Sequence, residues 1–519
     1  MTARRPPAPL LLLAGLVGAA ALLPIAYLAI TVADAGADAL DEAFGARAVA
    51  LLGRSTGLAA AVTASAVAIA LPLAWLTVRT DLPGRRAWTV LTALPLVIPS
   101  YIGAYLLVSA LGPAGLLRDV LGVERLPSIY GFAGAWLSLT LFTYPLVLLT
   151  VRAALRRLDP QLEEASRGMG RSGWETYRTV VLPQLRPAIG AGGLLVALYV
   201  LSDFGAVSMM RFDSLTRAIY TAYRSSFDRA QAASLACLLI AVTLVVIWLE
   251  ARTRSAAAYH RSGPGTARPA PVVALGRWRW PAVGLCAAVT VTALVLPVGV
   301  LGYWTTRSFA GDVDWGGLTG AAGHSLLAAG LAAVAAAACA LPVALLSARY
   351  RGWLPRLIER ATYATHALPG VVVGLALVFF GTRVALPLYQ TLAMLVAAFV
   401  LLFLPQAVGP ARAALLQVSP SLEEAARSLG RRAPAAFATV TAPLASGGIL
   451  AGAALVFLTA VKELPATLLL APIGFDTLAT DIWGATSVGF FERGAVPSLV
   501  LLLVSAPPLY ILTTRRGLR

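Results

Sequence analysis

The sequence predicts an all-α membrane protein with twelve transmembrane helices, arranged as two pseudo-symmetric halves of six helices each. Composition is the first reason, since the chain of 519 residues is 59% hydrophobic and only 13% charged, about half the charged share of a typical soluble domain. Apolar runs of about 20 residues, each long enough to cross a bilayer as a helix, recur along the chain. A polar, arginine-bearing segment also occurs twice, once in each half, as expected of a transporter built from repeats.

The apolar runs give the expected positions of the twelve helices. In chain order they lie roughly at residues 8–31, 55–78, 87–110, 131–152, 190–210, 230–250, 281–303, 324–347, 361–381, 385–409, 448–470 and 494–513. A stretch rich in Arg, Ala, Pro and Gly interrupts this pattern and predicts a cytoplasmic linker. The predicted domains are therefore a first half, 1–250, the linker, 251–280, and a second half, 281–519. Six helices in each half make the halves parallel repeats.

The net charge of +17 is explained by orientation in the membrane rather than by binding to nucleic acid. With the N-terminus inside and the helices alternating in direction, most basic residues fall in cytoplasmic segments, and acidic residues are more frequent outside. This distribution follows the positive-inside bias of membrane proteins. The first apolar run is too long for the core of a signal peptide, so it is expected to remain as a helix. Both termini are therefore expected in the cytoplasm.

The duplicated polar segment carries the most specific signal in the chain. Residues 160–171 read PQLEEASRGMGR, and residues 420–431 read PSLEEAARSLGR. A capping residue, Asp159 or Ser419, precedes the proline that opens each copy, which predicts the start of a short helix.

Each expected short helix carries charges at helical spacing. Glu163 is expected to pair with Arg167, and Glu423 with Arg427, because residues four apart share a helix face. A glycine three residues after each arginine is expected to break the helix or to permit close approach by another backbone. A single loop of this kind is typical of a solvated surface helix. Two copies in register instead favour a surface that docks a partner.

The repeated pattern resembles the signature of permeases from binding-protein-dependent ABC importers, which is Glu-Ala-Ala, three residues, Gly, nine residues, and a hydrophobe-x-Leu-Pro. The matching residues are Glu164-Ala165-Ser166, Gly170, Val180 and Leu182-Pro183 in the first copy, and Glu424-Ala425-Ala426, Gly430, Val440 and Ala442-Pro443 in the second. Ser166, the two valines and Ala442 are mild departures. The resemblance implies the type I ABC importer permease fold in a bacterial cytoplasmic (inner) membrane.

In that family the loop forms a coupling helix that lies in a cleft of a cytoplasmic ATPase. The resemblance therefore implies an ATPase-coupling role for two sets of residues, together with an extracytoplasmic solute-binding protein as a second partner. These residues are Glu163, Glu164, Ala165, Arg167, Gly170, Glu423, Glu424, Ala425, Arg427 and Gly430. Two loops imply two copies of the ATPase.

A single chain with two such halves resembles the fused permeases of ferric-iron and thiamine importers. Further segments, 80–86, 202–206, 462–467 and 474–480, resemble the iron subgroup, less specifically than the loop does. Ferric iron is therefore the expected solute, with thiamine, phosphonate or another small solute as alternatives. The external binding protein is expected to contact two outer loops, 211–228 and 471–493, through residues of mixed charge. These residues are Arg211, Asp213, Arg217, Asp476, Asp481 and Glu492.

No catalytic residues are expected in this chain. A P-loop needs Gly-x-x-x-x-Gly-Lys-Ser/Thr, and the only lysine is Lys462, within an apolar run. ATP and magnesium are therefore expected on a separate subunit, with no cofactor bound by this chain. His260, His324 and His366 lack metal-ligand spacing, so no metal site is expected. A secondary transporter, which also can have six plus six helices, is the rival class, but it gives no reason for two glutamate-alanine loops.

Three charges fall within apolar runs, namely Asp203, Lys462 and Glu463. An ionised side chain near the bilayer centre costs about 2.5–3.5 kcal/mol on insertion scales, so such residues normally face protein or water. The acids could line the solute pathway and favour a cation. They could also be structural, because Glu463 precedes Leu464-Pro465, where a proline frees backbone groups that polar side chains can satisfy. The structural interpretation is favoured.

Overall fold

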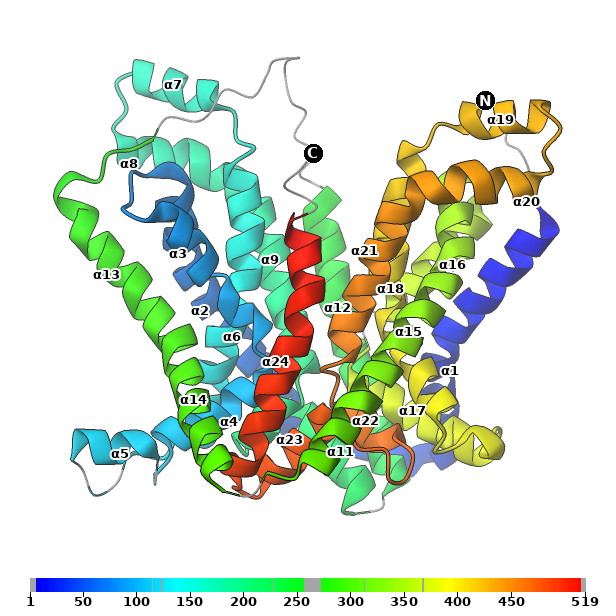
Figure 1. Cartoon of the computed structure of the whole chain (residues 1–519), viewed down its shortest axis with the longest axis horizontal. Coiled ribbons are helices and arrows are strands. Elements are labelled where there is room, and N and C mark those ends of the chain that lie inside the picture. Colours follow the sequence, from blue (N-terminus) through cyan, green and yellow to red (C-terminus); the bar gives the residue numbers. More distant parts are fainter. Residues whose placement is uncertain are drawn as a thin grey trace. The chain divides into compact units, whose positions relative to one another are not determined.

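The computed structural model describes residues 6–113, 115–122, 124, 126–226, 228–255, 272–311, 313–365 and 368–514. Within these ranges the chain is helical, and the only extended pairing is an isolated β-bridge between Thr80 and Val273. Ten helices in the searched ranges are long and apolar enough to cross a membrane, and Gly370–Arg383 is a shorter apolar helix. The prediction of an all-helical membrane protein is confirmed (Figure 1). Most of the linker, and with it His260, lies outside the described residues, as does His366.

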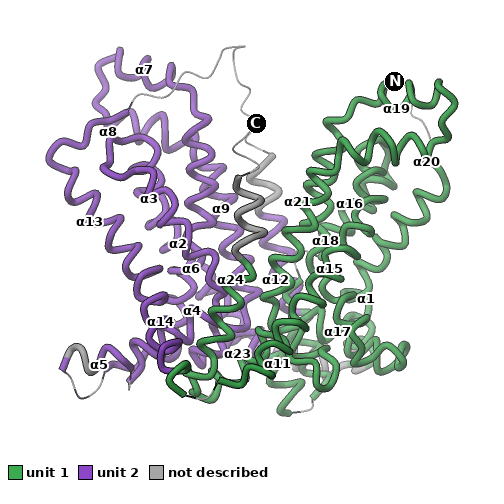
Figure 2. The backbone as a smooth tube through the Cα atoms, in the orientation of Figure 1, with its two compact units in different colours: residues 1–44, 219–237, 308–519 green, residues 45–218, 238–307 purple. Residues whose placement is uncertain are grey.

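The helices group into two compact units, coloured separately in Figure 2. Unit 2 comprises residues 45–218 and 238–307. Its helices are α2 (Ala46–Arg79), α3 (Arg85–Leu91), η1 (Leu94–Val97), α4 (Ser100–Leu111), α5 (Leu116–Leu121), α6 (Phe132–Leu155), α7 (Pro160–Gly168), α8 (Gly173–Thr176), η2 (Tyr177–Val181), α9 (Leu182–Ser202), α10 (Gly205–Met209), η3 (Gly276–Trp278), α13 (Arg279–Thr290), η4 (Val291–Val295) and most of α14 (Leu296–Ala310).

Unit 1 comprises residues 1–44, 219–237 and 308–519. Its helices are α1 (Ala8–Phe44), α15 (Trp315–Arg349), α16 (Trp353–Ala364), α17 (Gly370–Arg383), η6 (Leu386–Leu388), α18 (Leu392–Gln417), α19 (Pro420–Ser428), α20 (Ala433–Ala436), η7 (Phe437–Thr441), α21 (Ala442–Ala460), α22 (Pro465–Leu470), α23 (Leu478–Ser487) and α24 (Phe491–Thr514). Three helices have residues in both units, namely α11 (Leu215–Arg224), α12 (Arg229–Ser255) and, at its end, α14.

The compact units differ from the sequence halves at the helices that open each half, and residues 219–237 of the first half also belong to unit 1. Helix α1 opens the chain but packs against α15, α16 and α17 of unit 1. Its buried face repeats every seven residues through Ala14, Ala21 and Leu28, each fully buried. A Cβ atom at Gly18 on that face would lie 3.3 Å from Ile358, so the glycine allows close helix contact. Conversely, the helices that open the second half belong to unit 2.

Each unit has an equivalent core of three long helices. In unit 2 these are α2, α6 and α9, and in unit 1 they are α15, α18 and α21. A Cβ atom at Gly192 of α9 would lie 2.8 Å from the Cα of Val147, and one at Gly452 of α21 would lie 3.0 Å from the Cα of Ala407. Glycines at these equivalent positions let the backbones approach, as is common where membrane helices pack.

Several expected helices are interrupted. The third run of the first half divides into α3, η1 and α4, and its counterpart divides into α16 and α17. A proline precedes each final piece, Pro99 before α4 and Pro369 before α17, and proline removes a backbone donor. The fifth runs also break, at Asp203 after α9 and shortly after Ala460 in α21. These breaks place the intramembrane acids at helix ends rather than within continuous helices.

Candidate functional site

The two duplicated loops fold alike within their respective units. Each contains a short helix (α7 or α19), a glycine, a one-turn helix (α8 or α20), a π-helical turn and then a long helix. Asp159 caps α7 by accepting a hydrogen bond from the Gln161 amide at 3.0 Å. Gly170 and Gly430 have φ angles of +82° and +86°, a backbone conformation that favours glycine. The predicted short helices and the glycine breaks are confirmed.

Most residues of the predicted coupling set are exposed on these loops. They are Glu164, Ala165, Arg167 and Gly170 on the first loop, and Glu424, Ala425, Arg427 and Gly430 on the second. Large apolar side chains are exposed beside them at equivalent positions. Leu162 and Met169 expose 50% and 70% of their surface, and Leu422 and Leu429 expose 47% and 84%. Exposed apolar groups amid charged residues are typical of a surface that binds a partner. These four residues were not among the predicted coupling residues, although apolar side chains recur at the same positions of both copies.

Glu163 is not part of that exposed surface. The prediction that it pairs with Arg167 is corrected by the structure, in which Glu163 forms a buried ion pair with Arg79 at the end of α2. The side chains of Arg79 and Glu163 are only 1% and 5% exposed. The hydroxyl groups of Ser166 and Thr176 add a buried hydrogen bond of 3.1 Å between α7 and α8. The first loop is therefore tied to the helices beneath it.

The second loop is held by different contacts. Glu423 is half-buried and accepts a hydrogen bond of 3.2 Å from the Thr441 hydroxyl. Arg349, at the end of α15, corresponds to Arg79, but its Nε and Nη2 atoms are buried and have no hydrogen-bond partner among the described residues. Alanines at 426 and 436 replace the bonded Ser166 and Thr176. The polar tether of the first loop is therefore not reproduced in the second.

The intramembrane acids cap short helices. Asp203 Oδ1 accepts hydrogen bonds from the amides of Ala206 and Val207 at 2.9 and 3.3 Å, at the start of α10. Glu463 accepts hydrogen bonds from the amides of Ala466 and Thr467 at 3.0 and 3.1 Å, at the start of α22. These bonds satisfy amide groups that the helix break leaves without intrahelical partners.

The size of the residue that faces each acid complements the length of the acidic side chain. Asp203 accepts a further hydrogen bond from Ser100, which follows Pro99 at the start of α4. Gly370 occupies the corresponding place after Pro369, and a Cβ atom there would lie only 2.4 Å from Oε1 of Glu463. The shorter acid thus faces serine, and the longer acid faces glycine. Lys462, beside Glu463, is half-buried.

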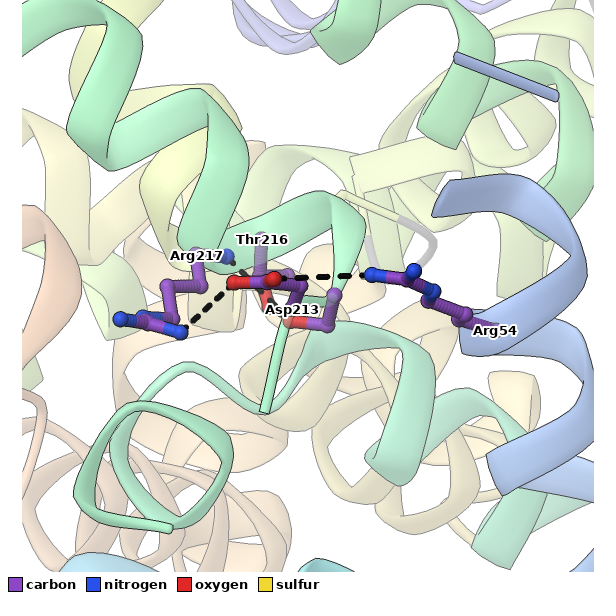
Figure 3. Close-up of polar contacts among 5 residues, drawn as sticks. Arg54, Asp213, Thr216 and Arg217 are labelled. Carbon is purple, nitrogen blue, oxygen red and sulfur yellow. Dashed lines mark hydrogen bonds and ion pairs between the residues drawn. The ribbon is translucent and has the colours of Figure 1, made fainter. Parts of the chain in front are cut away.

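The predicted outer loop of the first half lies at the other end of unit 2 from α7 (Figure 1). This loop borders a pocket of about 460 Å³. It is lined by Gly53, Arg54, Gly57, Phe132, Arg211, Phe212 and Asp213. Figure 3 shows Asp213 between two arginines, with distances of 3.5 Å to Arg54 and 2.7 Å to Arg217. Arg211 lies over the ring of Tyr130, 4.8 Å from its centre. The predicted charges on this loop therefore contact one another or a ring.

The corresponding loop of unit 1 contains Asp476 and Asp481. The backbone carbonyl of Asp476 lies 2.9 Å from Nδ1 of His324, whose ring stacks on Phe475. Burial and the neighbouring Asp476 raise the pKa of Asp481 above its usual value. Within the described ranges, no group of three or more His, Cys, Asp or Glu residues is arranged to hold a metal ion.

Comparison with known proteins finds the same repeat. The family described as "Binding-protein-dependent transport system inner membrane component" matches residues 66–254 and again residues 340–513. The Fe(3+)-transport system permease protein FbpB 2 of Haemophilus influenzae is 34% identical over 98% of this chain and 98% of its own length. The molybdenum transport system permease protein ModB of Escherichia coli is 32% identical over 38% of this chain and 92% of its own length. The ferric transport system permease protein FbpB of Actinobacillus pleuropneumoniae is 25% identical over 66% of this chain and 52% of its own length.

Proposed function

The chain belongs to the family of inner membrane components of binding-protein-dependent transport systems, and from this premise we propose that it imports ferric iron. In this proposal an external binding protein delivers the iron, free or as a small chelate, to the outer face of the permease. The carrying observation is the match to a ferric permease along nearly the full length of both chains. The ModB relative, by contrast, aligns with 38% of this chain.

Uptake measurements test the solute. Cells that lack this gene should lose uptake of radiolabelled iron and keep uptake of thiamine, and a plasmid copy of the gene should restore iron uptake. Normal iron uptake together with lost thiamine uptake would overturn the iron assignment and leave the membership of the family intact. Unchanged uptake of every solute tested, with the permease absent, would contradict an import role.

The energy for transport is proposed to come from two copies of a separate ATPase. One copy would dock on the exposed surface of the α7 loop and the other on that of the α19 loop. In this proposal both loops lie in the cytoplasm, as do both termini. Support comes from the exposed charges and from the apolar side chains Leu162, Met169, Leu422 and Leu429, which lie on short capped helices in both copies. Labelling of single cysteines introduced at Glu164 and Glu424, from either side of sealed vesicles, tests this orientation. Labelling of the two sites from opposite sides would overturn it.

Two neighbouring glycines provide a matched test of the coupling role. Gly170 requires a positive φ angle, whereas Gly168 ends α7 with open space around its Cβ position. Gly170→Ala should therefore strain the loop by about 1 kcal/mol or more and reduce both uptake and ATPase co-purification. Gly168→Ala should leave both unchanged. Equal uptake and equal ATPase co-purification by the two variants would show that the partner does not recognise the backbone shape of the loop.

A further inference from the structure

An arginine-tryptophan cluster lies where a membrane helix of unit 2 begins. Residues 276–280 read Gly-Arg-Trp-Arg-Trp and form η3 and the start of α13. They open the apolar span Gly276–Ala310. Arg277 and Arg279 are exposed, and Trp278 and Trp280 expose 62% and 75% of their surface. A soluble protein would rarely leave two tryptophans so near each other in the chain open to water, whereas this position suits the boundary between bilayer and water.

A short extended segment ahead of the cluster fixes its position against the end of α2. The Val273 amide donates to the Arg79 carbonyl at 2.8 Å, and the Asp81 amide donates to the Val273 carbonyl at 3.2 Å. The Leu275 amide donates to the Asp81 carboxylate at 2.8 Å. These three bonds join the last part of the linker region to the loop between α2 and α3.

That loop adds two more arginines. Arg85 and Arg86 are exposed at the start of α3, and Arg85 donates to the Thr80 carbonyl at 3.4 Å, directly beside the bridge to Val273. Asp81 is the only acidic residue in segments 79–86 and 272–280, and its carboxylate accepts the Leu275 amide. Four exposed arginines and two exposed tryptophans therefore lie on two hydrogen-bonded segments whose only acid is Asp81.

We propose that Arg85, Arg86 and residues 277–280 form a binding site for the phosphate headgroup of an anionic phospholipid. Arginine presents planar donors that fit phosphate oxygens in pairs, and basic clusters beside membrane helices attract anionic headgroups. Tryptophan rings anchor at the same depth of the bilayer. The tryptophans favour a lipid over a free anion, because a soluble phosphate would gain nothing from them. The proposal concerns how unit 2 is held in the membrane and is independent of the solute carried.

Unit 1 offers a matched control at the corresponding place. The start of α16 carries Arg351, Trp353 and Arg356, all exposed, with Trp353 at 74%. It has comparable charge and an exposed tryptophan on one short segment. Among the described residues, no β-bridge like that between Thr80 and Val273 joins this segment to a second one. Substitution of these arginines removes the same number of charges from the same protein.

Native mass spectrometry of the full chain, with phosphatidylglycerol or phosphatidylcholine added, tests the proposal. The protein should retain phosphatidylglycerol preferentially, and R277A/R279A should weaken that retention by about tenfold or more. R351A/R356A should change retention much less. Should R277A/R279A fail to yield folded protein, R85A/R86A, which leaves the linker bridge intact, should show the same loss. Equal retention of the two lipids, an equal loss in the control, or displacement of phosphatidylglycerol by millimolar inorganic phosphate would overturn the proposal.

Discussion

Replacing Gly370 by serine should damage the helix break of unit 1, and shortening the neighbouring acid should repair it. A Cβ atom at position 370 would lie 2.4 Å from Oε1 of Glu463 and 3.0 Å from Cγ of Pro465. The carboxylate would have to move, and the amides of Ala466 and Thr467 would lose their acceptor. Losing a helix cap and leaving a buried amide unsatisfied together cost about 2–4 kcal/mol.

The repair follows from the first half of the chain. There Ser100 faces the shorter Asp203, donates a hydrogen bond to it, and leaves it able to cap α10. The double variant G370S/E463D should therefore recover most of the stability that G370S loses. The two substitutions should show a coupling energy of about 1–3 kcal/mol, as is typical of residues in contact.

Thermal unfolding of the purified chain in one detergent, followed by fluorescence, measures these effects. The order of apparent Tm values should be wild type, then G370S/E463D, then G370S, with the single variant lowest. The substitution Ser100→Gly is the control in the other half, because it removes one hydrogen bond without creating overlap and should cost about 1 kcal/mol. If G370S/E463D is no more stable than G370S, the matched lengths of acid and facing residue do not determine stability at the break.

Two further predictions concern charged residues on the loops. Glu163→Gln should destabilise the protein by about 3 kcal/mol, because it leaves the buried Arg79 charge unpaired. Glu423→Gln should cost about 1 kcal/mol or less, since Glu423 is only half-buried. The apparent Tm values of the two variants measure this difference, and equal losses would contradict the unequal tethering of the loops. Asp213→Asn should change the Tm little, because the ion pairs of Asp213 with Arg54 and Arg217 are exposed. The variant should nevertheless alter the salt dependence of binding-protein association, measured by surface plasmon resonance. A large drop in Tm would show that these ion pairs are structural.

Local patterns in the sequence predicted the membrane helices, the short capped helices and the turn glycines. These features depend on residues within a few positions of each other, such as the Asp159-Pro160 start of α7. The equivalence of the two halves was also visible, because duplication preserves the order of residues. Helix breaks were harder to place, since the tertiary environment decides whether a proline or an acid ends a helix or is accommodated within it.

Contacts between distant residues were decided by the tertiary structure alone. The spacing predicted a partner for Glu163 four residues away, but the fold buries Glu163 and brings Arg79, at the end of α2, into an ion pair with it. A buried charge must be paired, so the available buried arginine took precedence over the exposed one. Likewise, chain order placed α1 in the first half, whereas its buried face packs in unit 1. The sequence by itself determined which segments cross the membrane and where helices begin, because hydrophobicity and capping are local properties. Helix partners depended on the complementary shapes of faces far apart in the chain, which only the folded structure brings together.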